Sequence, residues 1–219
     1  MKKNLIKWLG STVAVIALAS TAHATSISFN YASVVGADIS FAGDSTFTFA
    51  PALNNFQIGL TTGAGTGVAN GLFGEITGHY TIGAVSGNTA SVTGTGTFVI
   101  HDGLGNNLTA TLTWVDITQE GIGDVVNVSG DLNMSNVQYL GSNVDLKKFV
   151  TLGQGNGYNG LTAQFVPGLS INTLKTTAET TSFSGTATAV PDGGTTIALL
   201  GLGLLGVEAL RRKLQGSVA

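Results

Sequence analysis

The sequence contains no cysteine and few charged residues, and both absences restrict what the protein can be. Without cysteine there are no disulfides, no thiolate metal sites and no cysteine nucleophile. Charged residues make up 10% of the 219 residues, aromatic residues make up 7%, and there are only three prolines. Hydrophobic residues nevertheless reach 43%, which excludes wholesale disorder because disordered chains are poor in apolar residues and rich in charge.

Basic residues are almost missing from the middle of the chain. Between Thr25 and Val190 there are ten acidic residues against three lysines, a net charge of −7. A region with so few bases is a poor partner for nucleic acid or for anionic lipid. Glycine and threonine are abundant instead, with 32 and 29 residues in the whole chain. This composition is typical of strands joined by tight turns.

The first 24 residues have the pattern of a secretory signal peptide. Three lysines accompany an apolar run from Trp8 to Ala19, which is too short for an ordinary membrane span. Ala22 and Ala24 place small residues at the two positions that a signal peptidase reads. We therefore expect cleavage after Ala24 and export of the remainder. An N-terminal amphipathic helix is the alternative interpretation.

A second targeting pattern follows residue 190. The segment Pro191 to Gly194 breaks the chain, and Thr195 to Leu210 is almost wholly apolar. As a helix, this run is about 24 Å long, and snorkelling side chains or local thinning let it cross a hydrocarbon core of about 30 Å. We expect one transmembrane helix whose basic tail stays cytoplasmic and stops transfer. The stop-transfer residues are Arg211, Arg212 and Lys213.

The residues around this break carry a family resemblance. The run Val190-Pro191-Asp192-Gly193-Gly194, with the apolar span and basic tail behind it, resembles the VPDGG form of the PEP-CTERM sorting signal. Asp192 stands where the usual motif has glutamate. The resemblance covers residues 190–213 and implies processing by exosortase, a membrane cysteine protease of Gram-negative bacteria that make exopolysaccharide. It implies that the protein is first anchored in the inner membrane and then reaches the cell surface or the medium after processing. It does not indicate what the protein does there.

The region between the two targeting segments, residues 25–190, alternates with the period of two that marks β-strands. The pattern is visible in Ile27 to Tyr31 and in Phe47 to Phe49, and is clearest in Leu108 to Trp114. Val144 to Leu152 is the one segment that allows a short helix. About ten strands punctuated by glycine and asparagine predict an all-β domain, an antiparallel sandwich or barrel. A β-solenoid is the weaker alternative because no fixed repeat is present.

Few residues of this region suggest chemistry. Glu75 and His79 share one face of a strand and can in principle act as an acid and a base, although two solvent-facing residues are the simpler interpretation. His101 and Asp102 open a loop that, with Asn106, either forms a turn or supplies oxygens to calcium. The acidic spacing of a known calcium loop is missing, which favours the turn. No catalytic residue, cofactor or metal ligand is therefore assigned.

These observations predict an exported, non-catalytic surface or extracellular-matrix β-domain. Its processing partners are signal peptidase and exosortase, and exopolysaccharide is a candidate partner of the domain itself. A carbohydrate-binding module is the alternative, which exposure of Tyr80, Tyr139, Tyr158 or Trp114 would favour. Trp114 continues the apolar alternation of its strand, however, and so is expected in the core. A glycan-active enzyme is the remaining alternative and would require two converging carboxylates in a cleft.

Overall fold

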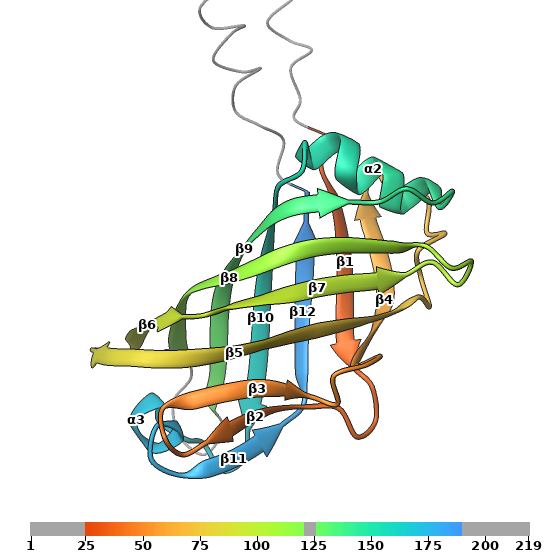
Figure 1. Ribbon diagram of the computed structural model, residues 1–219. Helices are drawn as coiled ribbons and strands as arrows, with labels where there is room; N and C mark the ends of the chain where they lie inside the picture. Colours follow the sequence, from red (N-terminus) through yellow and green to blue (C-terminus); the bar gives the residue numbers. More distant parts are fainter. Residues whose placement is uncertain (1–24, 121–125, 190–219) are drawn as a thin grey trace, which may run out of the picture. The chain divides into compact units, whose positions relative to one another are not determined.

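Strands dominate the structure, as the alternation predicts. The computed structural model describes residues 25–120 and 126–189, and within them twelve antiparallel strands belong to one hydrogen-bonded sheet (Figure 1). The elements are β1 (Ile27–Ser33), β2 (Asp38–Ala42), β3 (Thr46–Ala50), β4 (Phe56–Gly63), β5 (Phe73–Ser86), β6 (Thr89–Thr93), β7 (Thr95–His101), β8 (Asn107–Glu120), β9 (Val126–Gln138), α2 (Val144–Gly153), β10 (Gly157–Phe165), α3 (Ile171–Leu174), β11 (Ala178–Thr181) and β12 (Phe183–Thr188).

Two of the twelve strands, β6 and β11, are poorly marked in the sequence, which predicts about ten. The chain between β5 and β8 is divided at Gly94 into β6 and β7, because Gly94 has a φ of 128°. Strand β11 has only four residues, Ala178 to Thr181, and no apolar alternation that would reveal it in the sequence. The short helix that Val144 to Leu152 allow is present as α2, and the four-residue helix α3 is a second helix that the sequence did not indicate.

The strand pairings close on themselves. Strands β1, β12, β10, β9, β8, β7, β5 and β4 pair in this order, and β4 pairs again with β1. The β4–β5 link is short, with Phe56 opposite Gly74 and Gln57 opposite Phe73. In Figure 1, β5, β7 and β8 run across the direction of β10, β12 and β1. Of the two predicted arrangements, the pairings therefore give the closed one.

The interior of this closed sheet is filled by aromatic rings. Trp114 of β8 is only 3% exposed, so its expected place in the core is confirmed. Its ring packs edge-on against Phe47 at 4.9 Å between centroids and tilted against Tyr80 at 5.7 Å. Such offset and edge-on contacts are the favoured geometries of aromatic pairs. These ring contacts join β8 to β3 and β5, two strands with which β8 forms no ladder of hydrogen bonds.

Helix α2 packs against one end of the sheet. The Asn143 side chain caps its first turn by accepting hydrogen bonds from the backbone N–H groups of Asp145 and Leu146. Phe149 of α2 stacks on Phe29 of β1 at 5.0 Å. Figure 1 shows α2 beside the beginning of β1 and the end of β4. The helix thereby covers apolar side chains of the core that the sheet leaves open at this end.

Both targeting segments fall outside the described residues. These are the expected signal peptide at 1–24, the sorting motif Val190, Pro191, Asp192, Gly193 and Gly194, and the expected transmembrane run with its basic tail Arg211, Arg212 and Lys213. Over residues 25–120 and 126–189, no helix has the length and apolar character needed to cross a membrane.

Candidate functional site

The outer face of β9, β10, β12 and β1 carries cross-strand rows of short polar side chains. Inward residues of these strands are buried in the core, so the residues between them face outward. The pairing register aligns the outward residues into rows that run across the four strands. The three rows are Asp131, Gly160, Thr186 and Asn30; Asn133, Tyr158, Thr188 and Ser28; and Ser129, Thr162, Ser184 and Ala32.

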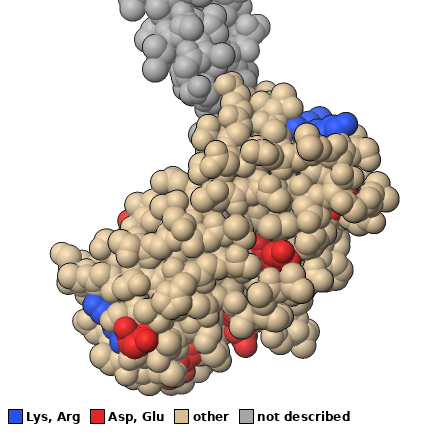
Figure 2. All heavy atoms as spheres, viewed as in Figure 1, with Lys and Arg blue, Asp and Glu red and all other residues tan. Residues whose placement is uncertain are grey.

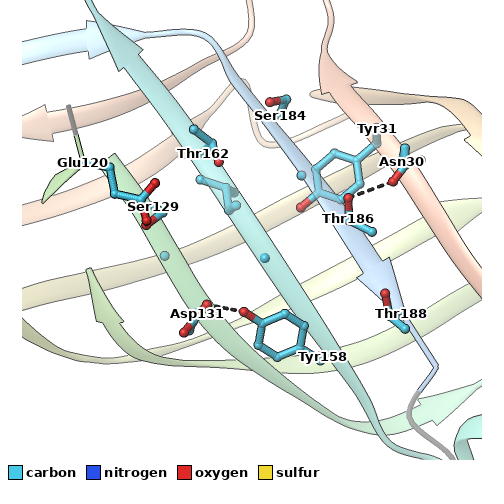
Figure 3. Close-up of a pocket in the computed structure, with 14 residues that line it drawn as sticks. Asn30, Tyr31, Glu120, Ser129, Asp131, Tyr158, Thr162, Ser184, Thr186 and Thr188 are labelled. Carbon is cyan, nitrogen blue, oxygen red and sulfur yellow. Dashed lines mark hydrogen bonds between the residues drawn. The ribbon is translucent and has the colours of Figure 1, made fainter. Parts of the chain in front are cut away.

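A hollow interrupts this polar face, and we call it the outer trough. It has a volume of about 570 Å³, and its lining extends from Glu120 at the end of β8 to Asn30 on β1 (Figure 3). Three glycines contribute to its lining: Gly130, Gly160 and Gly185. Of the three, only Gly160 lies on the outward side, so its missing side chain exposes the strand backbone there. Gly130 and Gly185 share the inward register of the buried Leu161. The result is an open, shallow site on a sheet face.

Tyr158 extends across Gly160 inside the trough. Its ring atom Cε1 lies 3.4 Å, and its hydroxyl 3.6 Å, from the position that a Cβ on Gly160 would take. The hydroxyl donates a hydrogen bond to Oδ1 of Asp131 on the neighbouring strand β9 (Figure 3). The residue remains 38% exposed. One side of the ring thus rests on the sheet while another part stays open to a ligand.

The surroundings raise the pKa of the Tyr158 phenol, which is protonated near neutral pH in any case. Burial raises the pKa of Tyr158, and the hydrogen bond to Asp131 and the negative charges of Asp131 and Asp116 raise it further, to about 12. The hydroxyl is therefore a permanent donor near neutral pH, and the bond to Asp131 holds the ring in place.

Acidic groups flank the trough, and none of the described residues lining it is lysine or arginine. Asp131 and Glu120 line it directly, and Oε1 of Glu120 accepts a hydrogen bond of 3.1 Å from Ser129. Asp116 pairs with Asp131 across β8 and β9. The trough is consequently a region of negative charge that also accepts hydrogen bonds.

A β-bulge places the acidic side chains of β8 on this face. The β8–β9 register shifts between Trp114 and Asp116, so that Val115 is an extra residue. Without the shift, Asp116 and Glu120 would share the inward side with Trp114. Because of the shift, Ile117 is buried instead, and Asp116 and Glu120 lie on the outer side. Strict alternation from Trp114 predicts the opposite side, and no local signature in the sequence selects these two acids from the others.

Glu75 and His79 do not pair as an acid and a base, the less favoured interpretation of their spacing, because Glu75 has another partner. Oε2 of Glu75 is bonded to Nε2 of His101 on β7 at 2.9 Å, and Nδ1 of His101 is 3.0 Å from Oδ1 of Asn107. Burial lowers the pKa of His101, but the hydrogen bonds to Glu75 and Asn107 outweigh it, so that the pKa lies above its ordinary value. This contact connects β5 and β7 away from the outer trough.

The loop that begins at Asp102 is a turn held by its own side chain. Oδ1 of Asp102 accepts hydrogen bonds from the backbone N–H groups of Leu104 at 2.7 Å and Asn106 at 3.0 Å, and Oδ2 accepts one from the hydroxyl of Tyr139 at 2.8 Å. Both carboxylate oxygens therefore have internal donors, which supports the turn interpretation over calcium binding. Among the residues that the structure describes, no group of three or more histidine and acidic side chains could hold a metal ion.

Of the aromatic residues considered for glycan binding, only one has the required exposure. Tyr80, Tyr139 and Trp114 are buried, whereas Tyr158 is exposed in the trough. The sequence included Tyr158 among the candidates but could not select it. The available signal was Tyr158-Asn159-Gly160, which places an aromatic residue and a glycine on the same side of one strand.

Comparison with known families supports the C-terminal assignment. Residues 189–214 match the family model of the VPDSG-CTERM motif, a C-terminal sorting motif of the PEP-CTERM type. This agrees with the resemblance found in the sequence and suggests an exported protein sorted by an exosortase-type enzyme. Neither a curated protein nor a solved structure matches the chain.

Proposed function

We propose that the protein is a non-catalytic β-domain displayed at the cell surface or in the extracellular matrix through its C-terminal signal. The observation that carries the proposal is the sorting motif matched at residues 189–214, which follows directly on β12. The signal therefore belongs to a chain whose preceding part is an all-β folded unit. Export brings this unit, rather than an unstructured segment, to the outside of the cell.

The charge of the domain suits this location. On the face shown in Figure 2, most of the surface is uncharged, and charged groups occupy only small patches. The domain has ten acids against three lysines. A surface of this kind has no basic region to hold it on nucleic acid or on anionic lipid. It is suited to contacts made through hydroxyl and amide groups.

Catalysis is not part of the proposal. A glycosidase holds two carboxylates on opposite sides of a scissile bond, about 5 to 10 Å apart. The carboxylates of the outer trough, Asp131 and Glu120, both lie at exposed positions on one sheet face, and each accepts a hydrogen bond from a neighbouring hydroxyl. Exposure on one open sheet face, with each carboxylate engaged by a neighbouring hydroxyl, supports a binding role over a catalytic one. A carbohydrate-binding role is the second candidate, and the exposed ring of Tyr158 favours it.

Cell fractionation tests the sorting part of the proposal. In a host with exosortase, the full chain is expected to reach the surface or the medium with a reduced mass. Pro191→Ala combined with Asp192→Ala should spare insertion but block processing, so that the protein accumulates in the inner membrane. Replacing Arg211, Arg212 and Lys213 by glutamine should weaken retention, because the tail then no longer stops transfer.

A matched control removes a positive charge elsewhere. Lys147→Gln changes an exposed residue of α2 and should be processed like the wild type. If the motif variant and the tail variant were both processed and released like the wild type, the sorting function would be wrong.

A further inference from the structure

We infer that the outer trough binds a glycan chain without acidic sugars, with Tyr158 as the platform for one sugar ring. The inference rests on the proposed function in one respect, since display outside the cell gives the domain access to extracellular polymers. The site itself is argued from the geometry of β9, β10, β12 and β1.

The first argument is the preorganised ring of Tyr158. Sugars present apolar C–H faces that pack on aromatic rings, and tyrosine offers a large amphipathic surface at a low entropy cost. Here Gly160 lets the ring extend along the sheet, and Asp131 holds its hydroxyl. A ligand therefore meets a ring already fixed in place, which reduces the ordering cost of binding.

The second argument is the chemistry of the surrounding rows. Thr186 donates a hydrogen bond of 2.8 Å to Asn30 (Figure 3). The hydroxyls of Ser28 and Thr188 are 2.9 Å apart. Hydroxyl and amide groups both donate and accept, as sugar hydroxyls do. These side chains can therefore exchange their mutual and solvent hydrogen bonds for bonds to a sugar.

The third argument concerns charge and decides the class of glycan. Asp131 and Glu120 line the trough, Asp116 lies beside it, and none of its described lining residues is basic. Carboxylates accept strong hydrogen bonds from sugar hydroxyls or amino groups. They repel uronic acids, sulfates and phosphates. The ligand is accordingly neutral or amine-bearing.

The shape of the site favours a chain over a single sugar. The polar rows cross four strands, a distance of about 14 Å at the usual strand spacing. The trough is open to solvent and has no wall that encloses one ring, so neighbouring sugars can continue beyond it.

Binding can be measured on the full chain, purified in a detergent without a sugar headgroup so that the detergent does not compete. The probes are three β-1,4-linked hexasaccharides: cellohexaose, the glucosamine hexamer and hexamannuronate. Isothermal titration calorimetry should detect binding of cellohexaose or the glucosamine hexamer, and markedly weaker or no binding of hexamannuronate. The inference is overturned if neither non-acidic probe binds, or if hexamannuronate binds as tightly.

Two variants test the platform independently. Tyr158→Ala should weaken binding by about tenfold or more, the effect of losing an anchoring aromatic contact. Gly160→Thr places a β-branched side chain, favoured in strands, where the Tyr158 ring now lies. It should weaken binding to a similar extent without lowering the melting temperature, so the test does not depend on whether Tyr158→Ala folds well.

Phe73→Ala is the matched control. Phe73 is a 45% exposed aromatic residue on β5 and is not part of the trough lining, so its removal should leave the affinity unchanged. Wild-type affinity in both trough variants would overturn the inference. A protein that binds none of the probes but is still processed and displayed would leave the proposed function standing.

Discussion

The six-membered ring of Trp114 lies directly against the backbone of Gly130 across the β8–β9 pair. A Cβ on Gly130 would come closer than 3.0 Å to Cζ3 and Cη2 of the indole, a distance that real Cβ contacts essentially never show. The glycine thus provides the space that the largest ring of the core occupies. The contact explains how β8 and β9 can pair closely while Trp114 points into the interior.

Replacing Trp114 by alanine should destabilise the fold strongly. The side chain is 3% exposed and packs on Phe47 and Tyr80, so its removal leaves a large cavity. The expected loss in the free energy of unfolding is about 3 to 5 kcal/mol, measured by urea denaturation. Unchanged stability together with lost glycan binding would reverse the core assignment of this residue.

Gly130→Ala should also destabilise the protein, because the added methyl group meets the Trp114 ring. The two substitutions should be less than additive, since Trp114→Ala removes the atoms that the methyl group strikes. A double-mutant cycle in urea measures this coupling. Gly160→Ala is the control: its methyl group would lie 3.4 Å from the nearest atom of Tyr158, which is ordinary contact, so it should cost much less. Equal costs at the two glycines would contradict the proposed clash.

Asp145→Asn should destabilise the contact between α2 and the loop that contains Thr66 and Ala69, between β4 and β5. The fully buried carboxylate accepts hydrogen bonds from the backbone N–H of Thr66 at 2.7 Å, from the Thr66 hydroxyl at 2.8 Å and from the backbone N–H of Ala69 at 3.2 Å. An amide turns one acceptor into a donor and leaves a buried group unpaired, at a cost of about 1 to 3 kcal/mol. Urea denaturation at neutral pH gives the value, with Glu179→Gln as a control for the loss of one carboxylate.

Asp145 should also make the free energy of unfolding depend on pH in the acid range. Burial alone raises the pKa of Asp145, but the hydrogen bonds from Thr66, Ala69 and Val68 outweigh it and lower the net pKa. A lowered folded-state pKa stabilises the fold above the unfolded pKa of about 3.9, and this contribution is lost as the pH falls through the folded-state value. The difference between wild type and Asp145→Asn should therefore shrink in this acid range. A constant difference at every pH would contradict the assignment.

Glu75→Gln should lower the pKa of His101 toward its ordinary value, because it removes the charge that favours the imidazolium. Because the pKa of His101 is higher in the folded state than in the unfolded state, its pair with Glu75 stabilises the fold. The stabilisation is complete below the unfolded-state pKa of about 6.5 and is lost as the pH rises through the folded-state pKa. NMR titration of His101 measures the shift, and urea denaturation should show a larger loss at pH 5.5 than at pH 8.5.

His79→Gln provides the control for this pair. His79 lies on the same strand as Glu75, and its replacement should leave the titration of His101 unchanged. A shift in the His101 pKa caused by His79→Gln but not by Glu75→Gln would show that the wrong partner was assigned.

Local patterns in the sequence determined much of the secondary structure. Alternation around Leu108 to Trp114 predicted both strand β8 and the burial of Trp114, because a strand exposes successive side chains on opposite faces whatever its neighbours are. The turn at Asp102 was predictable for a similar reason, since its hydrogen bonds to the backbone are local. The sorting motif was also readable, because its residues are contiguous.

The outer trough was decided by tertiary structure alone. Its rows join β1 to β12, where Ser28 meets Thr188 from 160 positions away, and alternation states which side a residue faces but not which strand lies next to it. The bulge at Val115 then reverses the side of Asp116, an effect that depends on the register with β9. In the same way His101, rather than His79, became the partner of Glu75 once β7 paired with β5. Closure of the sheet decides which strands lie side by side. The backbone N–H and C=O groups of each strand in the closed part must pair with those of a strand on either side.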